Sequence, residues 1–390
     1  MPILPEIAEI TPELKLFFRD LHAHPETGFN EHRTSAAVAH MLHRWGVEEV
    51  YENIGGTGVV GLIHGHGPGD RRIGLRADMD ALPIAEQTGL SYSSMNPGAM
   101  HACGHDGHTT MLLGAARYLA ATRTFEGTVV LIFQPAEEGL GGARRMLEEG
   151  LFHRFPCDEI YGFHNAPNGR LGHFSLRKGP SMAGASHFEI KVSGRGSHAA
   201  MPHESRDAIF AATALVQNLQ SVVSRSVAPH EACVLSVTKI SAGSAHNVLP
   251  ETADLAGTLR FFSHAVREVA QQRMREICAG LALAYGLTID ITFHEVFDVL
   301  VNSDSQAEAL LDAARDVLGP DSAEGNQQLV TVSEDFADML RHVPGAYGWL
   351  GHAGTAPLHS PFFVLDEAIL PVGASIFARI AELRLRPKPR

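Results

Sequence analysis

Short apolar runs alternate with amphipathic stretches over the first 180 residues or so. The apolar runs predict four buried strands, at residues 59–63, 73–75, 129–133 and 160–163. Between them, segments 34–45 and 106–121 have the spacing of helices, and Gly46 ends the first of these. Strands that alternate with helices in this way predict an α/β domain with a mixed, largely parallel sheet.

Segment 177–186 contains Gly, Pro and Ser and lacks periodicity, so we place a domain boundary there. Beyond it the pattern predicts strand, helix, strand, strand, helix and strand, around residues 188–192, 209–222, 233–240, 253–262, 266–281 and 287–293. This is the β-α-β-β-α-β order of a ferredoxin-like module. After residue 297 the α/β pattern resumes and ends in a helix at 368–383. We therefore expect an α/β domain of residues 1–182 and 297–390, interrupted by an α+β module of residues 183–296.

Composition excludes several classes of protein. The 390 residues are 45% apolar and 19% charged, which excludes a disordered chain, and no apolar run reaches the ~18 residues of a membrane span. A formal net charge of −13 argues against nucleic acid and membrane surfaces as partners. The four cysteines form no CxxC pair, and the first residues do not resemble a signal peptide, so we expect a cytoplasmic protein.

Several enzyme motifs are absent or misleading. Residues 56–61 match the dinucleotide-binding pattern G-x-G-x-x-G, but an apolar strand-like run follows them where that fold needs a helix. We interpret them as turn glycines before a strand. The chain has no H-E-x-x-H of a single-zinc protease and no G-x-S-x-G of a serine hydrolase. It also lacks the P-C-x-x-C of a zinc deaminase.

Histidine is unusually frequent, with 23 residues, and some of these accompany other metal-binding side chains. Four clusters combine suitable residue types: Cys103 with His105, Glu137 with Glu138, His164, and His359. A Glu-Glu pair alone is also common in solvated turns. However, three of the four clusters fall at carboxyl ends of predicted strands, where open α/β sheets bind ligands. The sequence therefore predicts a metal site in which one glutamate can bind metal while its neighbour serves as a base.

Seven motifs, in order along nearly the whole chain, resemble the aminoacylase/carboxypeptidase metallopeptidase family. Within it they are most similar to the amidohydrolase branch of hippurate hydrolases, N-acyl-L-amino acid amidohydrolases and auxin–amino-acid conjugate hydrolases. The motifs are RADMDALP (76–83), HACGHDGH (101–108), QPAEEG (134–139), GRGSHAAMPH (194–203), HNVLPETADLAGTLR (246–260), SEDFADML (333–340) and GHAGTAPLHSP (351–361). The resemblance implies a catalytic α/β domain with an inserted lid used for dimerisation, which matches the boundaries above.

The resemblance also implies a centre with two divalent metal ions. The family's ligand positions are matched by Cys103, His105, Glu138, His164 and His359. Cys103 stands where the family commonly has a bridging Asp, and as a thiolate it could bridge both ions. Glu137 matches the general base. Mixed Cys, His and Glu ligation suits zinc, manganese, nickel or cobalt, so the metal stays open.

Further residues are assigned by the same resemblance. Other branches have a His-x-Asp motif that supplies a first ligand, but here that place reads Arg76-Ala77-Asp78. We therefore assign Asp78 to the carboxylates that orient a metal-bound histidine. In the lid, His198 resembles the family's transition-state-stabilising histidine, and Asn247 and Arg260 match substrate-holding positions. Arg260 could equally be a surface residue, but a guanidinium suits the carboxylate of a substrate.

We therefore expect metal-dependent hydrolysis of N-acyl amino acids, of the N-acetyl or N-benzoyl (hippurate) type, to a carboxylate and a free amino acid. One alternative is a dipeptidase or carboxypeptidase of the same family. The other is a non-catalytic metal- or acyl-amino-acid-binding protein, which would have no need for an unligated Glu137. The resemblance further implies a homodimer, or a higher homo-oligomer, through the lid, with His198 in the neighbouring subunit's cleft.

Overall fold

The structure is a computed structural model that describes residues 3–386, so the outer limits of the predicted first domain, 1 and 390, lie outside it. The chain divides into two compact units. The first runs to Ser181 and includes Val301–Gln328 and the chain from Asp335 onward; the second comprises Met182–Leu300 and Leu329–Glu334. The sequence assigns residues 329–334 to the first domain. They group with the second unit because Ala183 N donates to the carbonyl oxygens of Val330 and Val332, a long-range contact without local signal.

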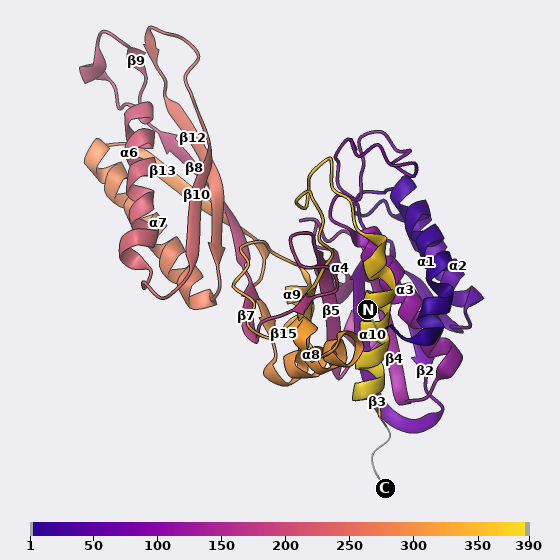
Figure 1. Cartoon of the computed structure of the whole chain (residues 1–390). Coiled ribbons are helices and arrows are strands. Elements are labelled where there is room, and N and C mark those ends of the chain that lie inside the picture. Colours follow the sequence, from indigo (N-terminus) through magenta and orange to yellow (C-terminus); the bar gives the residue numbers. More distant parts are fainter. Residues whose placement is uncertain (1–2, 387–390) are drawn as a thin grey trace. The chain divides into compact units, whose positions relative to one another are not determined.

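The first unit contains an eight-stranded sheet with the order β1-β2-β4-β3-β5-β16-β6-β15 (Figure 1). Its four central strands, β4-β3-β5-β16, pair in parallel, and antiparallel pairs flank them. This arrangement confirms the predicted mixed, largely parallel sheet. The strands are β1 Glu49–Ile54, β2 Gly58–His64, β3 Gly67–Asp78, β4 Glu126–Gln134, β5 Glu159–Ala166, β6 Phe174–Ser175, β15 Ala323–Glu324 and β16 Gly345–Gly351.

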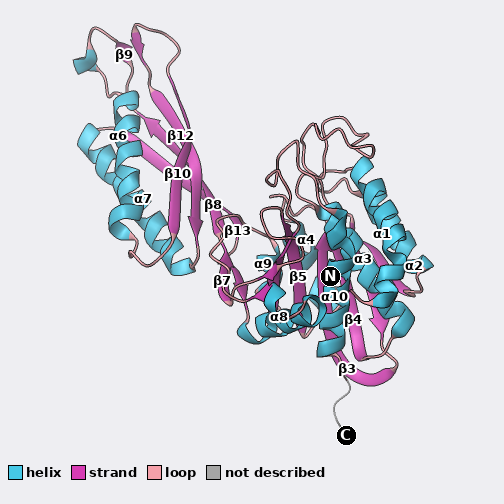
Figure 2. Cartoon of the chain, in the orientation of Figure 1, coloured by secondary structure: helices cyan, strands magenta, loops and turns pink. Residues whose placement is uncertain are grey.

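Helices surround this sheet (Figure 2). Residues 129–133 of β4 are fully buried, as expected for a strand covered on both faces. The helices are α1 Pro5–Ala23, α2 His32–Arg44, α3 His105–Thr122, α4 Gly142–Glu148, α5 Leu151–Arg154, α8 Asp304–Leu318, α9 Phe336–Leu340 and α10 Leu370–Arg384, with 3₁₀ turns at Pro320–Ser322 and Glu367–Ile369. Helix α10 begins at Leu370, two residues after the predicted start at residue 368. Asp366 caps the 3₁₀ turn at residues 367–369 by accepting a hydrogen bond from Ala368 N, and the α-helix follows that turn.

The second unit is built from a four-stranded antiparallel sheet with the order β10-β12-β8-β13. Its elements follow the chain as β8 Gly184–Ser193, α6 Ala208–Ser221, β10 Cys233–Ala242, β12 Thr252–Phe261, α7 His264–Tyr285 and β13 Thr288–Phe297. Apolar side chains of both helices and of the sheet form its own core. Smaller elements are β7 Gly179–Met182, β9 Ser197–His198, Pro202–Glu204, Val222–Ser226, β11 Val248–Leu249 and β14 Leu300–Asn302. Among residues 3–386, no helix has both the length and the apolar character needed to cross a bilayer.

Two glycines of the second unit provide a matched test of its packing. A Cβ atom at Gly257 of β12 would lie 2.1 Å from the carbonyl oxygen of Ser236 and 2.4 Å from the ring of Phe188, whereas a Cβ atom at Gly280 of α7 would meet nothing within 4 Å. We expect Gly257→Ala to lower the free energy of unfolding by about 1–3 kcal/mol. Gly280→Ala should raise it by about 0.5–1 kcal/mol. Urea unfolding measures both, and equal stability of the two variants would contradict this packing.

Candidate metal centre

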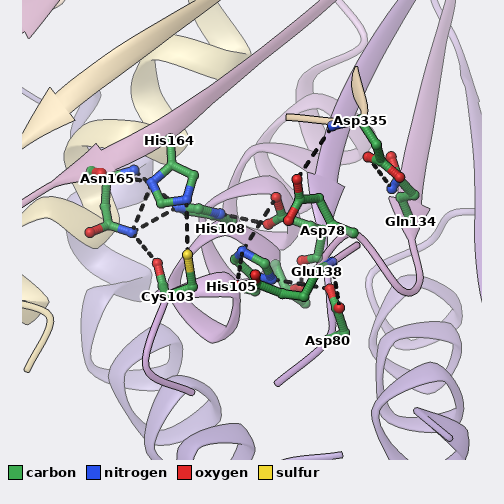
Figure 3. Close-up of polar contacts among 12 residues, drawn as sticks. Asp78, Asp80, Cys103, His105, His108, Gln134, Glu138, His164, Asn165 and Asp335 are labelled. Atoms are coloured by element: carbon green, nitrogen blue, oxygen red, sulfur yellow. Dashed lines mark hydrogen bonds and ion pairs between the residues drawn. The ribbon is translucent and has the colours of Figure 1, made fainter. Parts of the chain in front are cut away.

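The candidate metal ligands gather at the carboxyl edge of the first unit's sheet, and Figure 3 shows four of them, Cys103, His105, Glu138 and His164. Strand β4 ends at Gln134, directly before the turn that carries Glu137 and Glu138, and β5 carries His164 near its end. Helix α3 begins at His105. Because the central strands are parallel, their carboxyl ends meet at this edge, which is where α/β sheets bind ligands.

The backbone around these side chains is held in unusual conformations. Gly104 caps α3 with φ +89°, and a Cβ atom there would lie 2.4 Å from Nδ2 of Asn165, so only glycine fits between Cys103 and His105. Ala136 (φ 53°) and His359 (φ 63°) also adopt the left-handed conformation. Strained residues of this kind cluster at functional sites.

The structure brings all five predicted ligands together. Cys103 Sγ lies 3.3 Å from Nε2 of His164, and Nε2 of His359 lies 3.2 Å from Oε1 of Glu138. His105 Nε2 is 3.9 Å from the same Glu138 oxygen. Cys103 is shared by two groups whose possible ligand atoms lie within 4.8 Å of one another, one with His105 and His164 and one with Glu138 and His359. The donor set therefore has two halves that meet at Cys103.

The orientation of these side chains fits bound cations. Among the described residues, His105 Nε2 is buried without a hydrogen-bond partner, and Oε1 of Glu138 is buried facing the ring nitrogens of His359 and His105. His164 donates from Nδ1 to the carbonyl oxygen of Asn165 (2.7 Å), which directs the lone pair of its Nε2 towards Cys103. His105 likewise donates from Nδ1 to Asp80 (3.1 Å). Inward-facing nitrogens whose other ring atom is anchored in this way are typical of metal sites.

Electrostatics also favour a cation at this position. Burial and the charges of Glu138 and Glu137 raise the pKa of the Cys103 thiol well above its usual range. Burial opposes charge on His105, but Asp78, Asp80 and Glu138 outweigh it and raise the pKa of this histidine to about 10. Without metal, both groups therefore hold protons: protonated His105 offsets part of the surrounding negative charge, and the neutral thiol of Cys103 adds none. A divalent ion can replace those protons, as metal binding to thiols and imidazoles generally does.

The carboxylate that contacts Nδ1 of His105 is Asp80, whereas the sequence assigns such a role to Asp78. Asp80 also accepts a hydrogen bond from Glu138 N (3.1 Å), so it holds two candidate ligands at once. Asp78 instead accepts from His108 Nδ1 (2.6 Å) and Arg76 Nη1 (2.8 Å), and its nearest approach to His105 Nε2 is 3.8 Å. Asp80 lies in the same RADMDALP motif, but only the structure distinguishes the two carboxylates.

His108 is the third histidine of the HACGHDGH motif, and both of its ring nitrogens have protein partners. Nδ1 donates to Asp78, and Nε2 accepts a hydrogen bond from Asn165 N (3.0 Å). Asn165 also donates from Nδ2 to the carbonyl oxygen of Cys103 (2.6 Å). His108 and Asn165 therefore connect the segments that carry Asp78, Cys103 and His164, although the sequence predicted no role for either residue.

In the second unit, His198 and Asn247 lie together. Strand β9, which contains His198, pairs with β11, and Ala199 N donates to the carbonyl oxygen of Asn247 (3.0 Å). His198 Nδ1 accepts from Ala200 N (3.1 Å), so in its neutral form the ring proton sits on Nε2. Both side chains are exposed. His198 is therefore prepared to donate a hydrogen bond from Nε2.

Arg260 occupies a different part of the second unit. It lies near the far end of β12, roughly 27 Å along the strand from Thr252 at ~3.4 Å per residue. The half-buried guanidinium donates to Ser333 Oγ (2.6 Å), and burial lowers its pKa. Among the described residues, no acidic side chain forms an ion pair with Arg260. Ser333 belongs to the SEDFADML motif, yet sequence reasoning did not assign it.

Comparison with known proteins matches this architecture. The profile of peptidase family M20/M25/M40 matches residues 74–383. A hippurate hydrolase of Campylobacter jejuni is 41% identical, with 98% of this chain and 99% of the relative covered. An N-acetylcysteine deacetylase of Bacillus subtilis is 39% identical, with 94% and 95% covered.

A solved structure is also similar over nearly its full length. The Bacillus subtilis YXEP protein, described as a dinuclear metal-binding peptidase of the M20 family, superimposes with a TM-score of 0.86 at 34% identity, covering 97% of this chain and 99% of that one. These matches confirm the family resemblance seen in the seven motifs. The chain belongs to peptidase family M20/M25/M40.

Proposed function

We propose that this protein is a metal-dependent amidohydrolase that cleaves N-acyl amino acids, of the N-acetyl or N-benzoyl type, to a carboxylate and a free amino acid. The observation that carries this proposal is the convergence of five metal-binding side chains next to an additional buried carboxylate, Glu137. The family and the names of its similar members, hippurate hydrolase and N-acetylcysteine deacetylase, support the substrate class.

Two divalent ions would be held by Cys103, His105, Glu138, His164 and His359. When bound, the ions would lower the pKa of a water molecule and polarise the carbonyl group of the substrate. The buried nitrogen His105 Nε2, which has no hydrogen-bond partner and faces Glu138 Oε1, supports this assignment. The mixture of thiolate, imidazole and carboxylate suits zinc, manganese, nickel or cobalt.

Glu137 acts as the general base in this proposal. Its carboxylate is buried beside His105 and Glu138, and Oε1 accepts a hydrogen bond from Asp335 N (3.3 Å). It would take a proton from the attacking water and pass it to the leaving amide nitrogen, which completes cleavage of the C–N bond. A protein that only binds its ligand has no use for a second glutamate held in this way.

Arg260, together with Asn247 of the partner subunit, would bind the carboxylate of the amino acid. Arg260 is suited to this because its half-buried positive charge has no acidic partner among the described residues, and an anionic substrate would supply one. The substrate carboxylate would therefore join the guanidinium that Ser333 already contacts.

The second unit would serve as a ferredoxin-like lid that pairs with its symmetry mate in a homodimer. His198 would then stabilise the oxyanion in the partner's site through the proton on Nε2. Asn247 and its neighbour His198 lie just before β12, which begins at Thr252, whereas Arg260 lies near the other end of that strand. One small substrate cannot contact both ends of the strand in a single chain, and this separation supports the shared site. A cytoplasmic location stays a prediction from the cysteine pattern.

Replacement of the shared thiol tests the metal assignment. Cys103→Ser should lose at least one of two bound ions per subunit, because a hydroxyl is a far weaker ligand than a thiolate for these metals. Metal analysis after dialysis against zinc or manganese measures the loss. Cys157→Ser, at a free cysteine outside the cluster, is the matched control and should keep the wild-type metal content. Full metal content in Cys103→Ser would contradict the assignment.

Replacement of the proposed base tests the reaction. Glu137→Gln should lower kcat for hippurate and N-acetyl amino acids by about 10²- to 10⁴-fold with unchanged metal content. Glu148→Gln, at an exposed position of α4, should behave like the wild type. A dipeptide with a free amine serves as the competing substrate. Faster cleavage of that dipeptide than of hippurate by the wild type would favour a peptidase over the proposed amidohydrolase.

Subunit mixing tests the shared active site. Glu137→Ala and His198→Ala are each expected to be inactive, but a mixed dimer contains one site with both residues intact. Complete random exchange of equal amounts should therefore restore about a quarter of wild-type activity. Activity is measured before and after exchange, with dimer exchange followed by mass. A fully exchanged mixture that stays inactive would place His198 in the site of its own chain.

A further inference from the structure

Arg76 is fully buried at the end of β3, yet the proposed reaction does not use it. It is among the largest fully buried side chains of the structure. Its guanidinium donates to Gln134 Oε1 (2.8 Å), Asp78 Oδ2 (2.8 Å) and Asp335 Oδ1 (3.1 Å), and it lies 3.4 Å from the hydroxyl of Tyr347. Arg76 therefore connects the carboxyl ends of β3 and β4 to the segment at Asp335.

A buried arrangement of this type has a high desolvation cost. Arg76, Asp78 and Asp335 are each at most 1% exposed, so one positive charge and two negative charges are removed from water together. Apolar side chains of similar size often stabilise a core equally well or better than such ion pairs. The arrangement therefore suggests a requirement for defined geometry at this place.

Both carboxylate oxygens and the main-chain N–H of Asp335 form hydrogen bonds. Oδ1 also accepts a hydrogen bond from Gln134 Nε2 (2.7 Å), and Oδ2 accepts one from Ala143 N (2.9 Å) at the start of α4. The main-chain N–H of the same residue donates to Glu137 Oε1 (3.3 Å). The position of the peptide that contacts Glu137 is thus set by the side chain of Asp335 and, through it, by Arg76.

The main chain next to Glu137 is fixed independently. Ala136 N donates to the buried carboxylate of Glu31 (2.8 Å), and the carbonyl oxygen of Ala136 accepts from Gly142 N (3.0 Å). These contacts hold Ala136 in its left-handed conformation and set the direction in which the Glu137 side chain leaves the backbone. The Asp335 peptide then determines where one carboxylate oxygen lies.

We propose that Arg76 and Asp335 are positioning residues that hold the carboxylate of Glu137 in its reactive orientation. The inference rests on the proposed role of Glu137 as the general base. Both side chains are only 1% exposed and should not reach the substrate, so their loss should affect the chemical step and leave substrate affinity unchanged. A displacement of about 1 Å at a reacting group lowers turnover by up to 10²-fold.

Asp335→Asn is the sharpest change available. The Asp335 carboxylate accepts hydrogen bonds from three donors, on Arg76, Gln134 and Ala143 N. The amide of asparagine has donors on one side, so either orientation sets its NH₂ group against one of them. The side chain must move, and the peptide that contacts Glu137 moves with it.

The experiment compares Asp335→Asn with a matched control in the metal-loaded enzyme. We expect kcat for hippurate to fall about 10- to 100-fold, with KM and metal content unchanged. Asp338→Asn removes an acid of α9, the helix that begins directly after Asp335; Asp338 pairs with Arg144 (3.1 Å), and this variant should keep wild-type kcat. In a Glu137→Gln background, Asp335→Asn should cause no further loss, because two residues that act through one group are not additive.

A second readout is independent of activity. In a crystal structure of Asp335→Asn, the Glu137 carboxylate should leave the main-chain N–H of residue 335, while Cys103 and His164 keep their separation. Gln134→Met removes one donor to Asp335 with little change in volume, and should give a smaller effect of the same kind if Asp335→Asn does not fold. A wild type without amidohydrolase activity would refute the proposed function, and the crystallographic comparison still tests the positioning. An unmoved Glu137, or kcat losses that multiply in the double variant, would overturn the inference.

Discussion

Buried negative charge at the carboxyl edge of the sheet is the constraint on which the site depends. Four carboxylates lie close together there, near the thiol of Cys103: those of Asp78, Asp80, Glu137 and Glu138. In the absence of metal, protonated His105 balances part of this charge, and Cys103 stays a neutral thiol that adds none. Two divalent ions would balance this charge more completely. Ions held in this way would also activate the water and the carbonyl group in the proposed hydrolysis.

The surrounding fold can be understood as the means of holding this charge. Parallel strands end together, so β3, β4 and β5 deliver their carboxylates and imidazole to one edge. Gly104 allows the loop to turn tightly between Cys103 and His105. Behind the candidate ligands, Asp80 and Asn165 fix the ring orientations of His105 and His164 through hydrogen bonds, as residues next to a metal site commonly do. The buried Arg76 and Asp335 extend this support to Glu137.

The sequence allowed much of this arrangement to be predicted, because strand and helix periodicity is local and the ligand types are chemically distinctive. The convergence of Cys103 and His359 follows from their motifs and family resemblance. The choice between Asp78 and Asp80 could not be made, because which of two carboxylates reaches a histidine depends on side-chain direction in the folded sheet. Likewise, Ser333 contacts Arg260 only after residues 329–334 cross to the second unit. Such long-range contacts leave no periodic signal in the chain.

Anomalous X-ray diffraction from crystals of the metal-loaded protein tests the central claim most directly. Data collected on either side of the absorption edge of the bound metal locate each ion without reference to activity. The account predicts two anomalous peaks ~3.5–4 Å apart, one on each side of Cys103 Sγ, the first near His164 and the second near Glu138 and His359. A single peak, or peaks that do not contact Cys103, would contradict it.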